Sequence, residues 1–560
     1  MSVTSPVEPA ADSAAKPSGL LRHPLRTLAL LAAFAVTLFL SFWLLDYFYT
    51  DVARHGSRGP VQLFFDFDPG TLQNALPNLA QIITAVLGIA ITVVSIVVQL
   101  AANRYTPRVA EMFFRDRISL TVMGFFVVAC VDSLWVSFAV THDYVPQATI
   151  AATIAVATCG LLLLVPYFAY VFDFLDPEKV IARIGDQTLQ AALEARGGSG
   201  ALSTIVARQA ATVTSMEQLG DIAVNALAQK DKVIASDAIG ALRAVAVRYL
   251  PVKKTLPADW FVIGPSLLRT PDFVALAAQS IADLQQQRAW LEWKVLRQFR
   301  EVFAQACQSL PEMAHVVAIE ARYVGEAALA CGDQAVVQTT IKFMNTFLRQ
   351  ALNGRDVRAA YNVLNQYRQL AEAVMDQKGA GGDTAATATL VEMAGHFRYY
   401  AQLGSGMGLS FVAETAAYDL CTLCERASDR QAPAHDRLLA TLLELDKEAE
   451  NTAQEKALRG VRKAQAKLAS FYLLRGQTAH ARTIHADMAL ETPERLRSIR
   501  DELLAVTSKD FWEVVDRGTN FDYLDDARKE TLRAFFAWFG DLGPEARAVG
   551  ATRRAGARDA

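Results

Sequence analysis

The stretch from Leu79 to Arg117 constrains this chain more than any other, because an apolar run is followed directly by a short basic segment. Residues 79–101 contain no Lys, Arg, Asp or Glu. A helix of roughly 20 residues, at ~1.5 Å per residue, crosses a ~30 Å hydrocarbon core. The stretch therefore predicts a membrane-spanning helix, and the arginines after it mark its cytoplasmic end.

Other apolar runs of similar length lie on both sides of this one, so we expect four spans, at about 25–45, 79–101, 118–140 and 149–172. The loop between the second and third spans contains Arg104, Arg108, Arg115 and Arg117, whereas the loop between the third and fourth contains no Lys or Arg. By the positive-inside rule, both termini are predicted to be cytoplasmic.

Beyond residue 172, long helical patterns are broken by Gly and Pro, which predicts paired helices. We expect helices over 335–352 and 357–375 to pair, and a single short strand over 260–263. The fold class is therefore predicted to be all-α: a four-helix transmembrane domain followed by an irregular helical-hairpin cytoplasmic domain. The predicted division is a disordered tail (1–24), the transmembrane domain (25–172), two helical regions (173–375 and 384–540) and a second tail (541–560).

The amino-acid composition restricts the classes of partner that this chain can bind. The chain is 52% hydrophobic yet 20% charged, which fits a membrane part joined to a large soluble part. The net charge of -3 argues against nucleic acid as a partner, since phosphates need concentrated Lys and Arg. Six cysteines are too few for a disulfide framework and favour a reducing compartment.

Part of the membrane region resembles a known family. The matching residues are Thr92, Ser95, Gln99, Leu100, Tyr105, Thr106, Pro107, Arg108, Phe114, Arg115, Asp116, Arg117 and Gly124. This pattern is similar to that of a bacterial family of predicted integral membrane proteins classed as a domain of unknown function, most strongly over residues 75–125. The resemblance implies four membrane helices, a soluble C-terminal region and no settled function. We expect the chain to lie in a bacterial inner membrane. Separately, Leu468, Ala469, Tyr472, Gly476 and Ala481 resemble one tetratricopeptide hairpin over 468–488.

Small and polar residues spaced by three or four form a stripe along the second span: Gln81, Thr84, Gly88, Thr92, Ser95, Gln99 and Asn103. Two interpretations fit this stripe. It lines a water-filled path, or it forms a seam where helices pack closely. Asp132, near the middle of the third span, is costly in lipid and should face protein or water. It is either an ion or proton site or a carboxylate that pins two helices together.

The basic segment after the second span comprises Arg104, Pro107, Arg108, Arg115, Asp116 and Arg117. These residues fit a topology signal with lipid headgroup contacts. The alternative is that 115–117 docks the soluble region through ion pairs.

The soluble region shows no catalytic constellation, so we expect no enzyme activity, no cofactor and no metal site. Cys421-x-x-Cys424 lacks the further ligands of a zinc site and is interpreted as two buried thiols. His480 and His485 are five residues apart, too far round a helix for an i, i+4 zinc pair.

An aromatic and charged segment precedes the last helix, and its members are Phe511, Trp512, Asp516, Arg517, Asn520, Asp522 and Tyr523. Such a segment forms a recognition surface for a protein partner, or it packs onto the last helices with Asp525 as an N-cap.

These features favour an integral membrane protein that acts as a membrane-anchored helical scaffold or interaction protein. Its expected partners are the lipid bilayer, further copies of itself in a homo-oligomer, and a cytoplasmic protein. The alternative is a homo-oligomeric channel or transporter for an ion or small solute, lined by the stripe on the second span.

Overall fold

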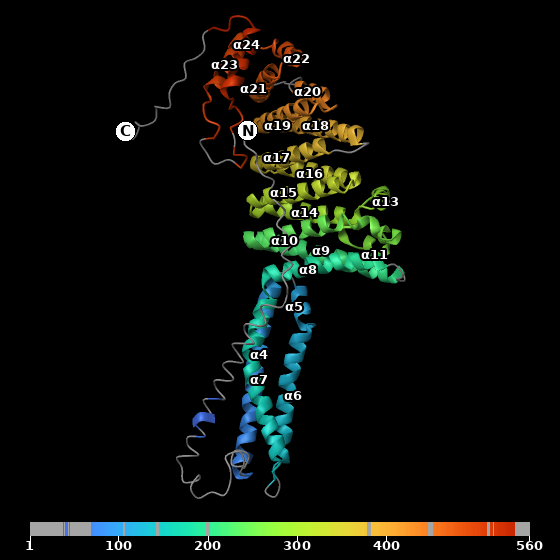
Figure 1. The fold of residues 1–560 in the computed structure, drawn as a ribbon, viewed down its shortest axis with the longest axis vertical. Coiled ribbons are helices and arrows are strands. Elements are labelled where there is room, and N and C mark those ends of the chain that lie inside the picture. Colours follow the sequence, from blue (N-terminus) through green and yellow to red (C-terminus); the bar gives the residue numbers. More distant parts are fainter. Residues whose placement is uncertain are drawn as a thin grey trace, which may run out of the picture. The chain divides into compact units, whose positions relative to one another are not determined.

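A computed structural model of the chain describes residues 69–104, 107–141, 145–197, 202–377, 382–445, 452–511, 516–518 and 520–543, with five isolated positions between 37 and 44. Every regular element in these residues is a helix (Figure 1), so the predicted all-α class is confirmed. The chain forms two compact units, Met1–Val180 and Ile181–Ala560. The finer division of the soluble region at 375–384 stays a prediction.

The first unit contains the membrane helices. From residue 69 on, its described helices are α4 (Pro69–Arg104), α5 (Pro107–Phe114), α6 (Arg117–Ala139) and α7 (Gln147–Phe174). Within the described residues, α4, α6 and α7 are long and apolar enough to cross a membrane. They correspond to the second, third and fourth predicted spans. The structure therefore shows three candidate spans rather than four, because the span expected at 25–45 lies almost entirely outside the described residues, as do the predicted tails.

Helices α4, α6 and α7 pack against one another along apolar faces. One buried cluster joins Leu72 and Leu76 of α4 to Val136 of α6 and Ile150 of α7. A second joins Ile83, Ala129 and Ala157 of the same three helices. In lipid there is little hydrophobic drive between helices, so close packing of this kind holds the bundle together.

The second unit is a succession of helices that stack one on the next in Figure 1. Helix α8 (Pro177–Glu194) runs across the boundary between the units. The α-helices that follow are α9 (Leu202–Ala228), α10 (Lys232–Tyr249), α11 (Pro265–Leu268), α12 (Pro271–Val274), α13 (Ala278–Gln286), α14 (Trp290–Ser309), α15 (Glu312–Ala330), α16 (Gln334–Asn353), α17 (Val357–Asp376), α18 (Gly382–Gly406), α19 (Ser410–Arg430), α20 (His435–Leu443), α21 (Thr452–Leu474), α22 (Thr478–Met488), α23 (Pro493–Ala505) and α24 (Asp526–Ala537). Three short 3-10 helices are η1 (Ala195–Gly197), η2 (Lys253–Thr255) and η3 (Ala258–Phe261).

Short turns connect the stacked helices. Gly332 and Gly476 adopt φ of +67° and +73°, which L side chains rarely adopt, and they end α15 and α21. The pair predicted at 335–352 and 357–375 is confirmed as α16 and α17, and the hairpin predicted at 468–488 forms from α21 and α22. Helices α9, α14, α15, α17, α19, α21 and α24 contact one another in sequence through the stack.

The strand expected over 260–263 is wrong, because this stretch is part of η3 and the turn that follows it. Trp260 N–H donates to the Pro257 carbonyl at 3.1 Å, which closes a 3-10 turn. The Trp260 indole donates to the Tyr249 hydroxyl at 2.9 Å and anchors the turn on α10. A β-strand needs a neighbouring strand to satisfy its backbone, and the described residues contain none.

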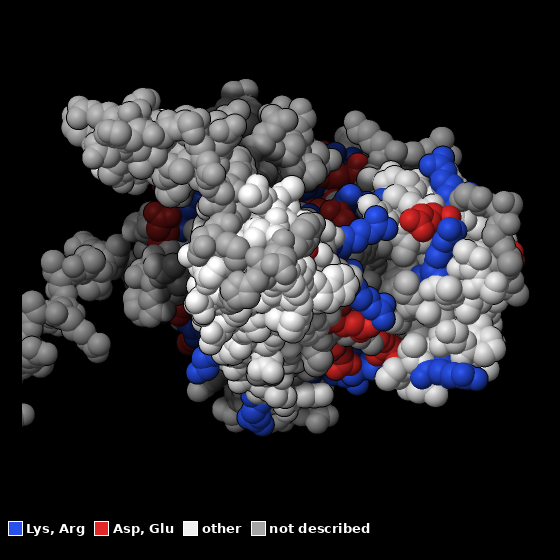
Figure 2. Space-filling view, turned by 90° about the horizontal axis from the view of Figure 1, so that it is seen from below, with Lys and Arg blue, Asp and Glu red and all other residues white. Residues whose placement is uncertain are grey.

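On the face shown in Figure 2, Lys and Arg side chains are interleaved with Asp and Glu side chains in the described part. In the second unit, exposed pairs such as Arg248–Asp186 and Lys232–Glu312 are typical. Solvent screens such exposed pairs, so they add little to stability. The stability of this unit therefore depends on its apolar core and its buried ion pairs.

Candidate functional site

The polar stripe of the second span lies outside the buried seam of the described bundle. The α4 residues buried in the seam are apolar, Ile83, Val94 and Val98 among them. Of the stripe residues, Gln81, Thr84, Gly88, Thr92 and Gln99 are exposed, Ser95 is half-buried, and the side chain of Asn103 lies outside the described residues.

Two hydroxyls of the stripe, those of Thr84 and Thr92, are satisfied within their own helix. Thr84 and Thr92 each donate to the carbonyl four residues earlier, Ala80 and Gly88, at 2.8 Å. A polar group that is hydrogen-bonded inside its helix tolerates lipid contact. These threonines therefore do not require a water-filled path.

Asp132 links two helices of the bundle. Its carboxylate accepts a hydrogen bond from Thr153 Oγ1 of α7 at 2.7 Å. The neighbouring Ser133 donates instead to its own helix, to the Ala129 carbonyl. Of the two interpretations of Asp132, this contact fits a carboxylate that pins α6 to α7.

In the basic segment, Asp116 has the most contacts. It is the N-cap of α6 and accepts hydrogen bonds from the Ile118 and Ser119 amides at 3.0 and 3.1 Å. It also accepts from the Tyr170 hydroxyl of α7 at 2.7 Å. Arg115 pairs with Glu111 one helical turn earlier, Arg117 is exposed, Pro107 begins α5, and the side chains of Arg104 and Arg108 lie outside the described residues.

Asp116→Ala is expected to destabilise the first unit by about 1–2 kcal/mol, because N-cap loss costs 0.5–2 kcal/mol and the Tyr170 bond is lost as well. Thermal unfolding of the full chain in detergent measures this loss of stability, with one fluorophore on α6 and one on α7 to report their separation. Arg117→Ala is the control and should change stability by less than about 0.5 kcal/mol. An equal effect of the two variants would contradict the capping role.

The segment predicted as a partner surface is bound to the helical stack over its described part. Asp516 accepts from Arg358 at 3.1 and 3.2 Å and from Asn362 at 2.9 Å. The Arg358 guanidinium, followed by the Asn362 amide, lowers the pKa of Asp516 below its ordinary value. Asp522 accepts from the Tyr418 hydroxyl and, at 3.0 Å, from Lys463.

Arg517 is the most deeply anchored residue of this segment. Its guanidinium donates to both carboxylate oxygens of Asp419, at 2.6 and 3.1 Å, and to the Tyr361 carbonyl at 2.6 Å. It also lies 4.2 Å from the centroid of the Tyr361 ring. Arg368 approaches the same Asp419 carboxylate at 3.1 Å. The buried cluster of Arg368, Asp419 and Arg517 therefore fixes the segment to α17 and α19.

Other members of the predicted surface lie beside this anchor. The Asn520 amide N–H donates to the Lys509 carbonyl at 3.0 Å, and Tyr523 is half-buried. Phe511 is exposed, and Trp512 lies outside the described residues. Asp525 caps α24 by accepting from the Arg528 amide at 2.8 Å, as the packing interpretation predicted.

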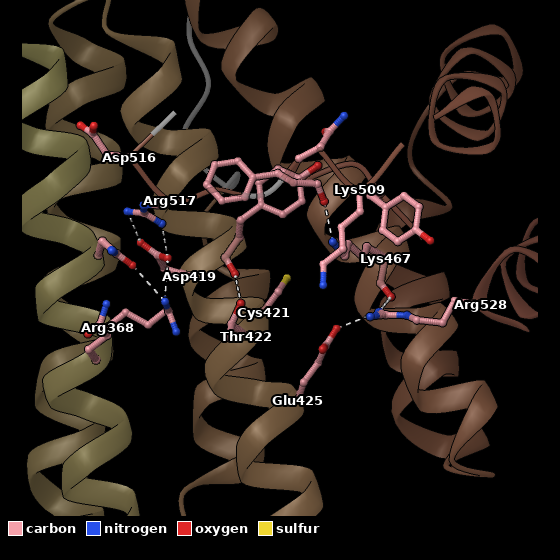
Figure 3. Close-up of a pocket in the computed structure, with 16 residues that line it drawn as sticks. Arg368, Asp419, Cys421, Thr422, Glu425, Lys467, Lys509, Asp516, Arg517 and Arg528 are labelled. Atoms are coloured by element: carbon pink, nitrogen blue, oxygen red, sulfur yellow. Dashed lines mark hydrogen bonds and ion pairs between the residues drawn. The ribbon is translucent and has the colours of Figure 1, made fainter. Parts of the chain in front are cut away.

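The anchored segment forms one wall of a pocket of about 520 Å³ (Figure 3). Its lining residues come from α17, α19, α21, the 506–525 connection and α24: Asn365, Arg368, Gln369, Tyr418, Asp419, Cys421, Thr422, Glu425, Lys467, Lys509, Asp516, Arg517, Asn520, Phe521, Tyr523 and Arg528. In Figure 3, Lys467, Lys509 and Arg528 lie on the side opposite Arg368 and Arg517. The rings of Tyr418 and Phe521 stack at 4.8 Å.

The lining contains five cationic side chains and three carboxylates, an excess of two positive charges. Lys467 is half-buried and donates to the Phe521 carbonyl at 2.5 Å. Burial, followed by the positive charge of Arg528, lowers the pKa of Lys467. Arg528 is itself paired with Glu425 at 2.7 Å. An anion beside Lys467 would reduce this repulsion, so the pocket favours an anionic group.

The pocket residues on helices α17, α19, α21 and α24 were not predicted from the sequence. Asp419 and Arg517 are 98 residues apart in the chain, and no local spacing connects them. The one available signal was a charged residue on an otherwise apolar face, since Asp419 lies within the run Ala416, Ala417, Leu420 and Leu423.

The prediction of two buried thiols is also confirmed. Cys421 and Cys424 are free and buried on α19, and burial raises the pKa of both thiols.

Comparison with known proteins identifies the membrane region. Residues 24–251 match the family described as Predicted membrane protein (DUF2254). This part of the chain matches a membrane-protein family. The resemblance predicted from residues 75–125 is thus confirmed, and the DUF2254 match also covers α8, α9 and α10. Curated proteins and solved structures give no match. The pocket lies wholly beyond the matched residues.

Proposed function

We propose that this protein is a membrane-anchored helical scaffold that binds an acidic segment of a cytoplasmic protein in the pocket between α19, α21 and the 516–528 segment. The proposal places it in a bacterial inner membrane, as a multi-pass protein with both termini in the cytoplasm. The arginines of 104–117 and the lack of Lys or Arg over 141–146 support this orientation.

The excess positive charge of the pocket carries this proposal. Carboxylates of a partner would approach Lys509, which is exposed, and then Lys467, which is half-buried. The stacked rings of Tyr418 and Phe521 provide an apolar surface next to these charges. Aromatic anchors with a few charged groups are typical of peptide-binding hot spots. A stack of helices also offers a rigid frame on which such a site is preformed.

The channel alternative is not proposed. The stripe residues Thr84 and Thr92 satisfy their hydroxyls within α4, and Asp132 is bound to Thr153. No contact in the described bundle favours a pore over packing.

Reversing the charge of Lys509 tests the proposed function. Fluorescein-labelled peptides that contain glutamates and one phenylalanine are titrated against the full chain in detergent, with fluorescence anisotropy as the readout. Wild type should bind them at least about tenfold more tightly than the Lys509→Glu variant, and more weakly as salt rises.

The matched control is Lys342→Glu, which makes the same charge change at an exposed lysine of α16. It should bind the peptides as wild type does. Equal binding of peptides with glutamine in place of glutamate, or an equal loss in both variants, would overturn the acidic-segment proposal.

A further inference from the structure

A cluster of metal-ligand side chains lies at the start of α20, away from the pocket. It comprises His435 and Asp436 in the first turn of α20 and His480 in α22, 44 residues later. One ligand atom from each residue lies within 4.8 Å of the other two. Sequence spacing relates His480 only to His485, whereas the fold brings it beside His435 and Asp436.

Two of the three distances within this cluster are close to those of a tetrahedral metal site. His480 Nε2 lies 3.1 Å from Asp436 Oδ1, and His435 Nδ1 lies 3.6 Å from the same oxygen. Zinc binds nitrogen and oxygen at about 2.0–2.2 Å. In a tetrahedron, such bonds place neighbouring ligand atoms about 3.3–3.5 Å apart. A central ion therefore needs only small side-chain adjustments.

A buried tyrosine orients one of the imidazoles. Tyr472, at the end of α21, has its hydroxyl 2.7 Å from His435 Nε2. With Nε2 held by this hydroxyl, His435 Nδ1 is the nitrogen that lies toward Asp436. Metal-binding histidines usually have their second nitrogen fixed in this way. The Tyr472 ring also lies 5.2 Å from the His480 ring, which restricts that side chain.

We propose that His435 Nδ1, Asp436 Oδ1 and His480 Nε2 bind one divalent ion of the zinc class. Two imidazoles and one carboxylate suit Zn²⁺ and related transition metals rather than Mg²⁺ or Ca²⁺, which prefer oxygen ligands. Three protein ligands leave the fourth position open to water or to a side chain of a partner. The ion would join α20 to α22 near the end of the helical stack, independently of the anion pocket.

Zinc titration of the full chain tests this site. The protein is purified in detergent with a tag that contains no histidine, stripped with a chelator, and titrated with Zn²⁺ against a chromophoric competitor. Wild type should bind one equivalent of Zn²⁺. The Asp436→Ala variant should bind Zn²⁺ at least about tenfold more weakly, so that this equivalent is lost. The Asp436 side chain is 84% exposed, so its removal leaves the fold intact.

Four further measurements distinguish a site from adventitious binding. His480→Ala should lose the same equivalent of Zn²⁺, and Tyr472→Phe should lower the Zn²⁺ affinity by about 10- to 100-fold. His485→Gln, which changes a residue of α22 outside the cluster, should still bind this equivalent of Zn²⁺. Bound Co²⁺ should give the intense visible absorption of a tetrahedral site in wild type and not in Asp436→Ala. Zinc binding that is absent in wild type, or equal in wild type and Asp436→Ala, would overturn the proposal.

Discussion

Replacing Asp419 with alanine is expected to lower the free energy of unfolding of the second unit by about 3–5 kcal/mol, the cost of breaking a buried ion pair. The Asp419 side chain is 2% exposed and binds both Arg517 and Arg368. When Asp419 is removed, the Arg517 guanidinium, whose side chain is 5% exposed, loses its carboxylate partner and keeps only its hydrogen bond to the Tyr361 carbonyl. Urea unfolding of the full chain in detergent, followed by tryptophan fluorescence, measures the change.

Asp516→Ala is the matched control, because it also removes a carboxylate that binds an arginine of this region. Asp516 is 26% exposed and Arg358 is 65% exposed, so solvent screens the pair. The expected loss is below about 1 kcal/mol. A loss for Asp419→Ala no larger than that for Asp516→Ala would show that burial does not strengthen the anchor.

Periodicity and turn residues predicted much of this fold. The helix pair at 335–376 follows from amphipathic spacing, from Gly354 and from Asp356, whose side chain caps α17 by accepting from the Ala359 amide at 2.9 Å. The strand prediction failed because aromatic and β-branched residues at 260–263 favour a strand only where another strand is available. There, Pro257 begins a 3-10 turn instead.

The candidate sites were less predictable, because they depend on contacts between distant helices. Arg517 was identified from the sequence, but its partner Asp419 and the pocket cations Lys467 and Arg528 were not. His480 was considered with the wrong partner, since the contacts of His435 in α20 with Tyr472 in α21 and His480 in α22 decide which imidazoles meet. A single sequence gives the period of each helix but not the register in which helices pack.

Replacing Lys253 with methionine is expected to cost about 3–5 kcal/mol, because it leaves a fully buried carboxylate without its cation. Glu292 is 0% exposed, and Lys253 Nζ lies 2.9 Å from its Oε1 and 2.6 Å from Asp333 Oδ2. Neither Glu292 oxygen has an aligned hydrogen bond. The charge of Lys253 is therefore the main compensation for burying this group, and urea unfolding of the full chain in detergent measures its loss.

The penalty should also depend on pH. Burial raises the pKa of Glu292, and Lys253 opposes this shift, so the variant raises it further. A carboxyl whose pKa is raised in the folded state binds more protons in the folded than in the unfolded state. Its contribution to stability is therefore present below the unfolded-state pKa and is lost as pH rises through the folded-state pKa. The cost of Lys253→Met should therefore be larger at about pH 7.5 than at about pH 5.

A double variant separates charge burial from lost packing. Lys253→Met combined with Glu292→Leu removes both charges and should recover most of the stability, since well-packed apolar groups often replace a buried ion pair at no cost. Asp333 remains, but it is 16% exposed and caps α16 through the Val336 amide, so solvent and the helix N-terminus stabilise its charge. If the double variant were as unstable as Lys253→Met at both pH values, the loss would come from packing around Lys253 rather than from the unpaired Glu292 carboxylate.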